Sequence, residues 1–433
     1  MRSITRLTTP LLCLFGCAVL FGAPSARAGS PLQTALGDLY GICLFDKGGT
    51  AQNNPFSNAA FLSRSSLAPG ITGFIESNLS SIPLTPPSVK SVFDNGQIVN
   101  VVTGFSPIFT ENSSTVGGGK IFVGGNFSYY DFSKLRGQDL GETSFVFADN
   151  NRQDVVTVTM PLDVKASVYT FYGTYGIANN LDLGVALPVV NMSIKADGTE
   201  FTVVGNQSNC GYGPTDCDPN TVSSPQTPPL SLYQVSAAVN EDDLSSTFLS
   251  TVALRMKYRF KAAPNSGRGA IVADFRLPVR DSNGLLGKGD FGARVTFVGE
   301  APSRGGFTPY VNLGAQLWDG DSSNSLNLAA GFSQLFAQNL SFSFDLLATI
   351  DVESDTFLEK IDDQVPLQND ATAVSLVTSS IPEVKREHEL NTAIGFQYAV
   401  TQDFEAYGSA LFSLLDHGLH ANVVPTIGLS YHY

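Results

Sequence analysis

Hydrophobic and polar residues alternate along many segments of the chain from about residue 120 onward. In the last of these segments every second side chain is apolar, and the side chains between are mostly small or polar. The apolar positions are Val423, Pro425, Ile427, Leu429, Tyr431 and Tyr433. A period of two residues is typical of a β-strand that has one apolar and one polar face. The pattern therefore predicts an all-β protein.

The alternating segments are long, and there are about twelve of them. Their approximate spans are 119–131, 154–177, 180–196, 246–261, 268–280, 289–301, 308–319, 324–335, 340–352, 388–399, 403–415 and 422–433. Most strands in globular proteins have about five or six residues. The longer segments found here match the tilted strands of transmembrane barrels.

The connections between these segments alternate in length. Short ones, such as 178–180 and 401–402, alternate with longer ones, of which the longest are about 197–245 and 353–387. Outer-membrane barrels have short periplasmic turns and long external loops, whereas a soluble β-sandwich has no reason to alternate in this way. We therefore expect a transmembrane antiparallel up-and-down β-barrel of about twelve strands.

The region before the barrel lacks this alternation. Residues 29–118 are interpreted as an element that plugs the lumen or lies at its periplasmic mouth. A β-hairpin is expected around Asp94-Asn95-Gly96, because the dipeptide Asn-Gly favours tight hairpin turns. Alternatively, residues 97–110 form another strand with an unrecognised partner, which would give fourteen strands.

The first 28 residues have the parts of a cleavable signal peptide. Arg2 and Arg6 precede an apolar run at 11–22, and Ala26-Arg27-Ala28 forms a cleavage site before residue 29. A lipoprotein signal around Cys17 is the alternative. No later run of apolar residues is long enough for a transmembrane helix. The expected domains are a signal peptide at 1–28, the plug or periplasmic element at 29–118 and the barrel at 119–433.

The composition excludes one class of partner and suggests one covalent link. The chain has a formal net charge of −14, and cleavage removes only basic residues. Such an acidic protein lacks the electrostatic footprint needed to bind nucleic acid. Cys210 and Cys217 lie in a segment rich in Gly, Pro and Asn, which suits a small loop disulfide in an oxidising compartment. Cys43 is interpreted as a buried thiol.

Four short blocks of the chain form a distinctive set, at Thr115–Lys120, Tyr175–Pro188, Leu254–Phe260 and Leu285–Gly289. In their order and spacing they resemble a known family of outer-membrane transporters, the one named after the meta pathway of phenol degradation. The chain departs from the family pattern at Ser106-Pro107, Glu111-Asn112 and Leu277–Arg280. The resemblance runs from about residue 36 to the C-terminus. It implies a barrel in the cell outer membrane, distantly similar to fatty-acid and hydrocarbon channels, with no catalytic residues.

The end of the chain suggests partners in export. A terminal aromatic residue on the last strand, here Tyr433, is typical of barrels handed to the outer-membrane assembly machinery. The other expected partners are outer-membrane lipid, lipopolysaccharide and a small-molecule solute. No cofactor is expected, because the glycine runs near 117 and 287 lack the Gly-Lys-Ser/Thr sequence of a phosphate-binding loop and are interpreted as turns.

Parity along three neighbouring strands places their charged residues opposite the apolar face. The lumen-facing candidates are Arg255, Lys257, Arg259, Asp274, Arg276, Arg280, Asp290 and Arg294. A charge in lipid costs about 2–4 kcal/mol at the midplane, so these side chains must point inward. They form either a path for an anionic solute or a salt-bridge network between barrel wall and plug. For the second case, the region 29–118 offers five acidic partners: Asp38, Asp46, Glu76, Asp94 and Glu111.

Other chemistry has weaker support. His417 and His420 are three residues apart, but no cysteine accompanies them, so we expect no metal site. Ser430 and His432 share one face without a third orienting group, so we expect no hydrolase. The sequence favours a passive channel or transporter for a small hydrophobic, aromatic or anionic solute. A structural or adhesive barrel without flux is the alternative, and an outer-membrane enzyme is the least favoured class.

Overall fold

The fold is known from a computed structural model. It describes residues 92–94, 97–99, 110–149, 154–159, 161–195, 200–204, 233–236, 244–249, 252–261, 267–277, 291–319, 324–337, 339–352, 365–367, 370–379, 386 and 388–433. The expected signal peptide at 1–28 lies outside these ranges. So do Cys43 and the expected disulfide between Cys210 and Cys217.

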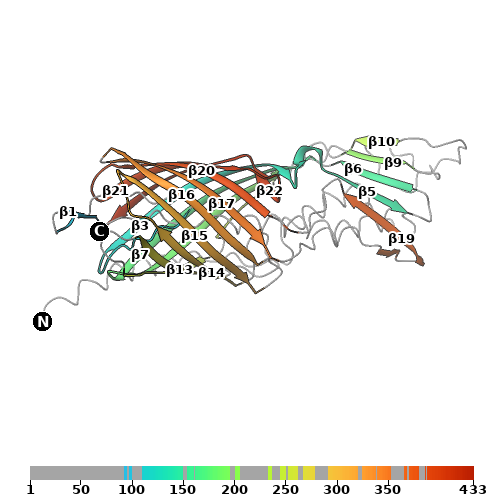
Figure 1. Ribbon diagram of the computed structural model, residues 1–433. Helices are drawn as coiled ribbons and strands as arrows, with labels where there is room; N and C mark the ends of the chain where they lie inside the picture. Colours follow the sequence, from blue (N-terminus) through green and yellow to red (C-terminus); the bar gives the residue numbers. More distant parts are fainter. Residues whose placement is uncertain are drawn as a thin grey trace, which may run out of the picture.

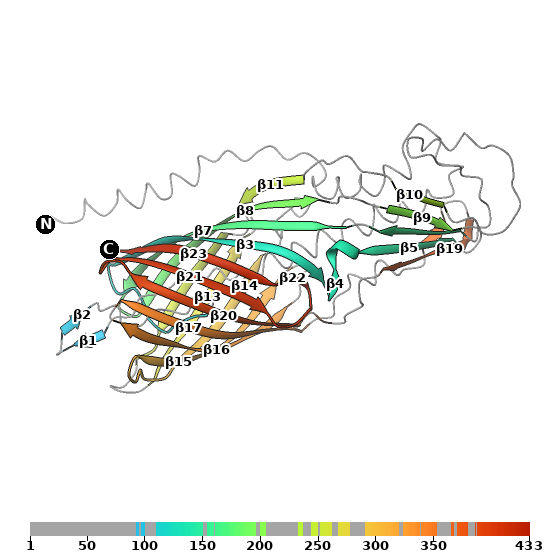
Figure 2. The same ribbon diagram turned by 90° about the horizontal axis from the view of Figure 1, so that it is seen from above.

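Twelve antiparallel strands of the described chain close into a barrel, which Figures 1 and 2 show from two sides. In chain order they are β3 (Ile121–Leu135), β7 (Asp163–Ala178), β8 (Leu181–Lys195), β12 (Val252–Arg259), β13 (Arg268–Leu277), β14 (Gly292–Glu300), β15 (Phe307–Trp318), β16 (Ser325–Ala337), β17 (Leu340–Asp351), β20 (His388–Ala399), β21 (Phe404–Ser413) and β23 (Val423–His432). Each strand pairs with the next in this order, and β23 pairs with β3 to close the ring. The short strand β11 (Leu244–Leu249) also pairs with β8, ahead of β12.

The up-and-down barrel predicted from alternation is confirmed. The alternative of fourteen barrel strands is wrong, because β1 (Val92–Asp94) and β2 (Gln97–Val99) pair with each other rather than with the ring. These two strands are the hairpin expected around Asp94-Asn95-Gly96. Within the described chain, no helix is long and apolar enough to cross a bilayer.

The two faces of each strand differ as the period-two pattern predicts. On β23, Ile427 is 64% exposed, whereas its neighbour Thr426 is 3% exposed. The same alternation runs along β15, where Leu313 is 53% exposed and Asn312 is 4% exposed. Apolar side chains therefore cover the outside of the barrel, and the alternate positions point into it.

Large aromatic side chains on the buried face lie over glycines of the neighbouring strand. The directly opposed pairs are Tyr172 with Gly124, Tyr310 with Gly331, Tyr407 with Gly428 and Trp318 with Gly292. A Cβ atom at Gly428 would lie 2.3 Å from Cζ of Tyr407. Glycine is needed there because only a residue without a side chain lets the ring lie flat along the wall.

Three long connections form a second sheet. Its six strands, in spatial order, are β10 (Tyr233–Ser236), β9 (Glu200–Val204), β6 (Asp154–Thr159), β5 (Ser144–Asp149), β19 (Asp370–Ser379) and β18 (Val365–Leu367). Figure 1 shows this sheet beyond the end of the barrel that carries the long connections. The longest predicted connections, 197–245 and 353–387, therefore contain strands that the sequence pattern did not predict.

The predicted strand at 154–177 is also wrong, because it is two strands in two sheets. β6 ends at Thr159 and pairs with β5 and β9, whereas β7 begins at Asp163 and belongs to the barrel. Pro161 lies between them, and proline cannot donate a hydrogen bond to a sheet ladder.

Candidate functional site

The buried face of the barrel wall changes character around the ring. On β7 and β8 it is mainly apolar, with side chains such as Val168 and Met192. From β14 to β17 it is mainly polar. The buried polar side chains there are Thr296, Glu300, Thr308, Asn312, Gln316, Ser325, Ser333, Ser341, Ser343 and Asp345. One side of the interior is therefore suited to water and polar solutes.

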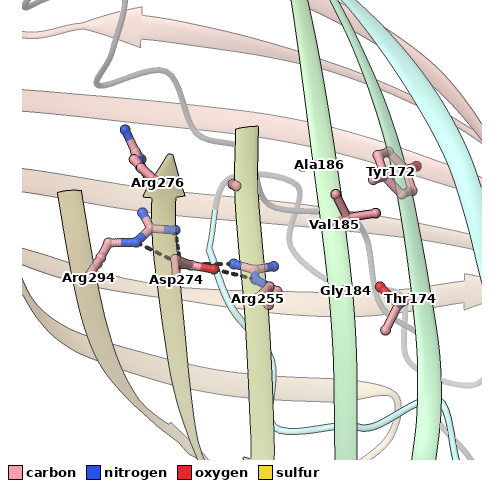
Figure 3. A pocket seen from close by; sticks show the side chains of 10 residues that line it. Tyr172, Thr174, Gly184, Val185, Ala186, Arg255, Asp274, Arg276 and Arg294 are labelled. Atoms are coloured by element: carbon pink, nitrogen blue, oxygen red, sulfur yellow. Dashed lines mark hydrogen bonds and ion pairs between the residues drawn. The ribbon is translucent and has the colours of Figure 1, made fainter. Parts of the chain in front are cut away.

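Charged side chains meet on the three strands between these regions. Asp274 on β13 lies directly opposite Arg255 of β12 and Arg294 of β14 in the strand register. Nε of Arg255 donates to Oδ1 of Asp274 at 2.7 Å, and Nη2 of Arg294 donates to Oδ2 at 2.7 Å. Nε of Arg294 donates to the same Oδ2 at 3.0 Å. One carboxylate thus bridges two guanidinium groups, as the dashed lines in Figure 3 show.

A second carboxylate reaches this group from a segment before the first barrel strand. Glu111 forms an ion pair with Nη2 of Arg255, and its Oε2 lies 3.3 Å from Nζ of Lys257. We call Glu111, Arg255, Lys257, Asp274 and Arg294 the charged cluster. Their side chains are only 6–16% exposed, so the pairs are largely withdrawn from solvent. Of the acidic partners that the sequence offered, Asp38, Asp46 and Glu76 lie outside the described residues, and Glu111 lies at the cluster.

Glu111 belongs to a segment that crosses the barrel, and we call Thr110–Val116 the lumen segment. At one end, Oγ1 of Thr110 donates to Oδ1 of Asp345 on β17 at 3.0 Å. At the other end, the backbone N–H of Val116 donates to Oδ2 of Asp182 on β8 at 2.9 Å. β8 and β17 are six strands apart in either direction around the ring of twelve. The lumen segment therefore joins opposite walls.

The middle of the lumen segment is held by a further acid. The N–H of Ser113 donates to Oε1 of Glu300 at 2.8 Å, and its hydroxyl donates to Oε2 at 2.7 Å. Ser113 is completely buried. Strand parity on β14 places Glu300 on the same face as Arg294, so alternation alone could have identified this wall carboxylate. Nothing comparable marks Ser113, because the lumen segment has no periodic pattern.

A narrow pocket adjoins the charged cluster. It is lined by Tyr172, Thr174, Gly184, Val185, Ala186, Ala253, Arg255, Asp274, Arg276 and Arg294 (Figure 3). Cζ of Arg276 lies 5.6 Å from the ring centroid of Trp318. The cavity volume is about 10 Å³, which is roughly the least that one water molecule needs. With the lumen segment in place, the pocket has no room for an organic solute.

The remaining predicted residues lie elsewhere. Nη2 of Arg259 donates to the backbone carbonyl of Asn179 at 2.8 Å, so this side chain lies at the short turn between β7 and β8. Arg280 and Asp290 lie outside the described residues. Two further wall carboxylates, those of Asp182 and Glu405, are also on the buried face, and both residues are 4% exposed.

Two weaker candidates from the sequence were a Ser430/His432 pair and a metal site at His417 and His420. His432 Nε2 is 3.7 Å from Oε1 of Glu405, and the Ser430 hydroxyl is 3.5 Å from the other oxygen of the same carboxylate. Both side chains thus face the carboxylate, and no hydrogen bond between the serine and the histidine is found in this part of the chain. Among the described residues, no three His, Cys, Asp or Glu side chains are placed to hold a metal ion.

Comparison with known proteins gives only distant matches. No protein-family model matches the chain, and no curated protein is similar to it. A crystal structure of an outer-membrane channel from Pseudomonas putida F1 is 7% identical, with a TM-score of 0.46, and covers 76% of this chain and 100% of that one.

Two further solved structures are similar at the same low level. A Pseudomonas aeruginosa FadL homologue is 10% identical, with a TM-score of 0.30, and covers 81% of this chain and 98% of its own. OprB from Pseudomonas putida is 7% identical, with a TM-score of 0.28, and covers 73% and 94%. These likenesses are too low to indicate what the chain carries, and they do not show the phenol-degradation family.

Proposed function

We propose that the protein is an outer-membrane β-barrel through which a small anionic solute passes. The outside of the barrel supports the membrane assignment. Its exposed side chains include Leu254, Met256, Phe275, Phe297, Val311, Leu313, Leu328, Leu346, Phe396, Ile427 and Leu429. An apolar outer band is what the lipid-facing surface of a transmembrane barrel requires.

Aromatic residues gather toward the end of the barrel that carries the short turns. Phe332 contacts Phe307, Phe342 and Phe344, with ring centroids 5.1, 6.1 and 5.9 Å away. Phe342 also contacts Phe396, at 5.3 Å. Aromatic girdles mark the interfaces of outer-membrane barrels. This belt, together with the signal-peptide pattern, supports an outer-membrane location with the short turns on the periplasmic side.

The charged cluster inside the barrel is the observation that carries the proposed transport. Three cationic side chains, from the two strands that flank β13, face the interior beside a wall that is mainly polar from β14 to β17. Side chains of this kind select anions in pores. The polar lining favours an anionic solute over the hydrophobic or aromatic ones, although the resemblance to the phenol-degradation family keeps the latter as the less favoured proposal.

The lumen segment supports the plug assignment for the end of the region 29–118. It crosses the interior next to the charged cluster, where it would obstruct a solute. The same observation favours the second candidate function, a structural or adhesive barrel without flux. In that case the ion pairs between Glu111 and the wall would serve only to fasten the segment.

Conductance of single molecules in planar bilayers separates these two functions. Glu111→Gln removes the charge that fastens the lumen segment and leaves Arg255 and Lys257 in place. We expect larger and more frequent conductance than in the wild-type protein, with a preference for anions. Glu142→Gln is the matched control, because Glu142 is exposed and lies between the barrel and the second sheet. If the wild-type protein, Glu111→Gln and a deletion of residues 29–95 all fail to conduct, the barrel is structural or adhesive and the proposed transport is wrong.

A further inference from the structure

The lumen segment makes contacts of two chemical kinds with the wall. Its neutral hydroxyl and N–H groups donate to three wall carboxylates, which are Asp182, Glu300 and Asp345. Its one carboxylate, from Glu111, binds wall cations instead. The interior is thus complementary to a set of hydroxyl and N–H donors that carry a single carboxylate.

We infer that the solute is a hydroxylated carboxylate that occupies the positions now filled by the lumen segment. This inference rests on the proposed transport function and names its substrate class. A sugar acid has the required groups, and so does a short acidic peptide with a serine side chain. Either one could replace the Ser113 hydroxyl at Glu300 and the Glu111 carboxylate at Arg255 and Lys257.

The spacing of these groups sets the size of the solute. Ser113 follows Glu111 by two residues, and two residues of extended chain span at most about 7 Å. The carboxylate and a ring hydroxyl of one hexuronic acid cover a similar distance. A monosaccharide acid is therefore long enough to reach both the cationic and the acidic part of the wall.

Solutes with only half of this chemistry fit less well. An apolar acid such as hexanoate would pair with Arg255 and Lys257 but leave Glu300 without a donor from the solute. A neutral sugar such as glucose would donate to the carboxylates but leave Lys257 without the anion that Glu111 now supplies, and Arg255 with Asp274 alone. A buried polar group without a partner costs about 1–3 kcal/mol, and more when it is charged. A site built for hydrogen bonds therefore rejects analogues that lack the bonding group.

The test is uptake into proteoliposomes of glucuronate, glucose, hexanoate and the dipeptide Ser-Glu, each counted above its uptake into protein-free liposomes, because hexanoic acid also crosses lipid unaided. The acids are supplied as potassium salts with valinomycin, so that charge movement does not limit uptake. We expect glucuronate or Ser-Glu to enter roughly tenfold faster than glucose or hexanoate, the factor that one charge-assisted hydrogen bond supplies. Glu300→Gln should remove the advantage over hexanoate and keep most of the advantage over glucose. The control Glu142→Gln should change neither.

A second measurement reports whether the solute displaces the lumen segment. In Ser113→Cys the introduced thiol occupies a completely buried position. Its labelling by a water-soluble maleimide, quantified by mass spectrometry of the peptide that contains position 113, should speed up at least threefold with glucuronate and stay constant with hexanoate.

The outcomes separate the inference from the proposed function on which it rests. Uptake ordered by molecular size alone, or labelling that glucuronate leaves unchanged, overturns the inference and leaves the channel in place. Equal uptake of hexanoate and glucuronate also overturns it, because the hydroxyl groups then contribute nothing. If no solute enters through the wild-type protein or through Glu111→Gln, the proposed transport is itself wrong.

Discussion

Asp274 is the residue whose removal should most disturb the charged cluster. Its two oxygens accept three hydrogen bonds of 2.7–3.0 Å from Arg255 and Arg294. Asp274→Asn keeps the size of the side chain but removes its charge, so two neighbouring guanidinium groups lose their shared anion. Glu111 is then the one carboxylate left in the cluster, and it already pairs with Arg255 and Lys257.

The expected loss of stability follows from how enclosed the pairs are. Breaking a buried ion pair by removing one partner costs about 3–5 kcal/mol, because the other charge remains uncompensated. The side chain of Asp274 is 6% exposed, but that of Arg294 is 16% exposed and retains some access to solvent. We therefore expect the lower end of this range, about 3 kcal/mol.

Urea unfolding in lipid vesicles measures this loss. The chain has one tryptophan, and Trp318 stacks on Arg276 beside the cluster, so its fluorescence reports on this part of the wall. Asp416→Asn is the matched control, because Asp416 pairs with Lys134 and its side chain is 54% exposed. An exposed pair contributes about 0–1 kcal/mol. If Asp274→Asn is no less stable than Asp416→Asn, solvent reaches the cluster freely and the reasoning from burial is refuted.

Two further predictions concern the wall itself. Gly428→Ala should destabilise the barrel by about 1–3 kcal/mol, because the added carbon overlaps the ring of Tyr407. Gly408→Ala, where the nearest atom would be 3.8 Å away, is the control, and equal urea midpoints for the two variants would contradict the prediction. Leu313→Arg puts a charge on the outer face at mid-strand and should cost about 2–4 kcal/mol in a bilayer. A normal unfolding midpoint in lipid vesicles would argue against lipid contact there.

Alternation predicted the barrel because it is a local property of each strand. The segment at 340–352, for example, became β17 at Leu340–Asp351. Parity also follows from the period of two, and it correctly separated exposed Ile427 from buried Thr426. Once the strands pair in sequence order, no information from distant parts of the chain is needed to build the ring.

The second sheet could not be predicted in the same way. All of its strands except β19 are short, with three to six residues, and they pair across connections that are far apart in the sequence, as Phe145 does with Ser379. A strand of three to six residues carries too few alternating positions to stand out from a loop. The choice of partner is made in three dimensions, so the segment at 154–177 was read as one strand although its first part belongs to this sheet.

The sequence predicted that the inward charges need partners, but it did not predict which residue supplies them. Parity required the charged residues of β12, β13 and β14 to point inward, and buried charges require partners. Five acidic residues before the barrel were equally suitable on chemical grounds. The structure places Glu111 at the cluster because the lumen segment is tied to both walls, at Asp345 and at Asp182.

Stability alone is a weak reason for a protein to keep such a cluster. Withdrawing an ion pair from water costs about as much as the pair recovers, and apolar side chains of similar volume are often equally stabilising. β7 and β8 show that this wall can bury apolar side chains, such as Val168 and Met192. A fastening for the lumen segment could therefore have been built from apolar contacts. Exchange with a charged solute explains the cluster better. A solute carboxylate can take the place of Glu111 at the wall cations, so the lumen segment can leave without exposing unpaired charges.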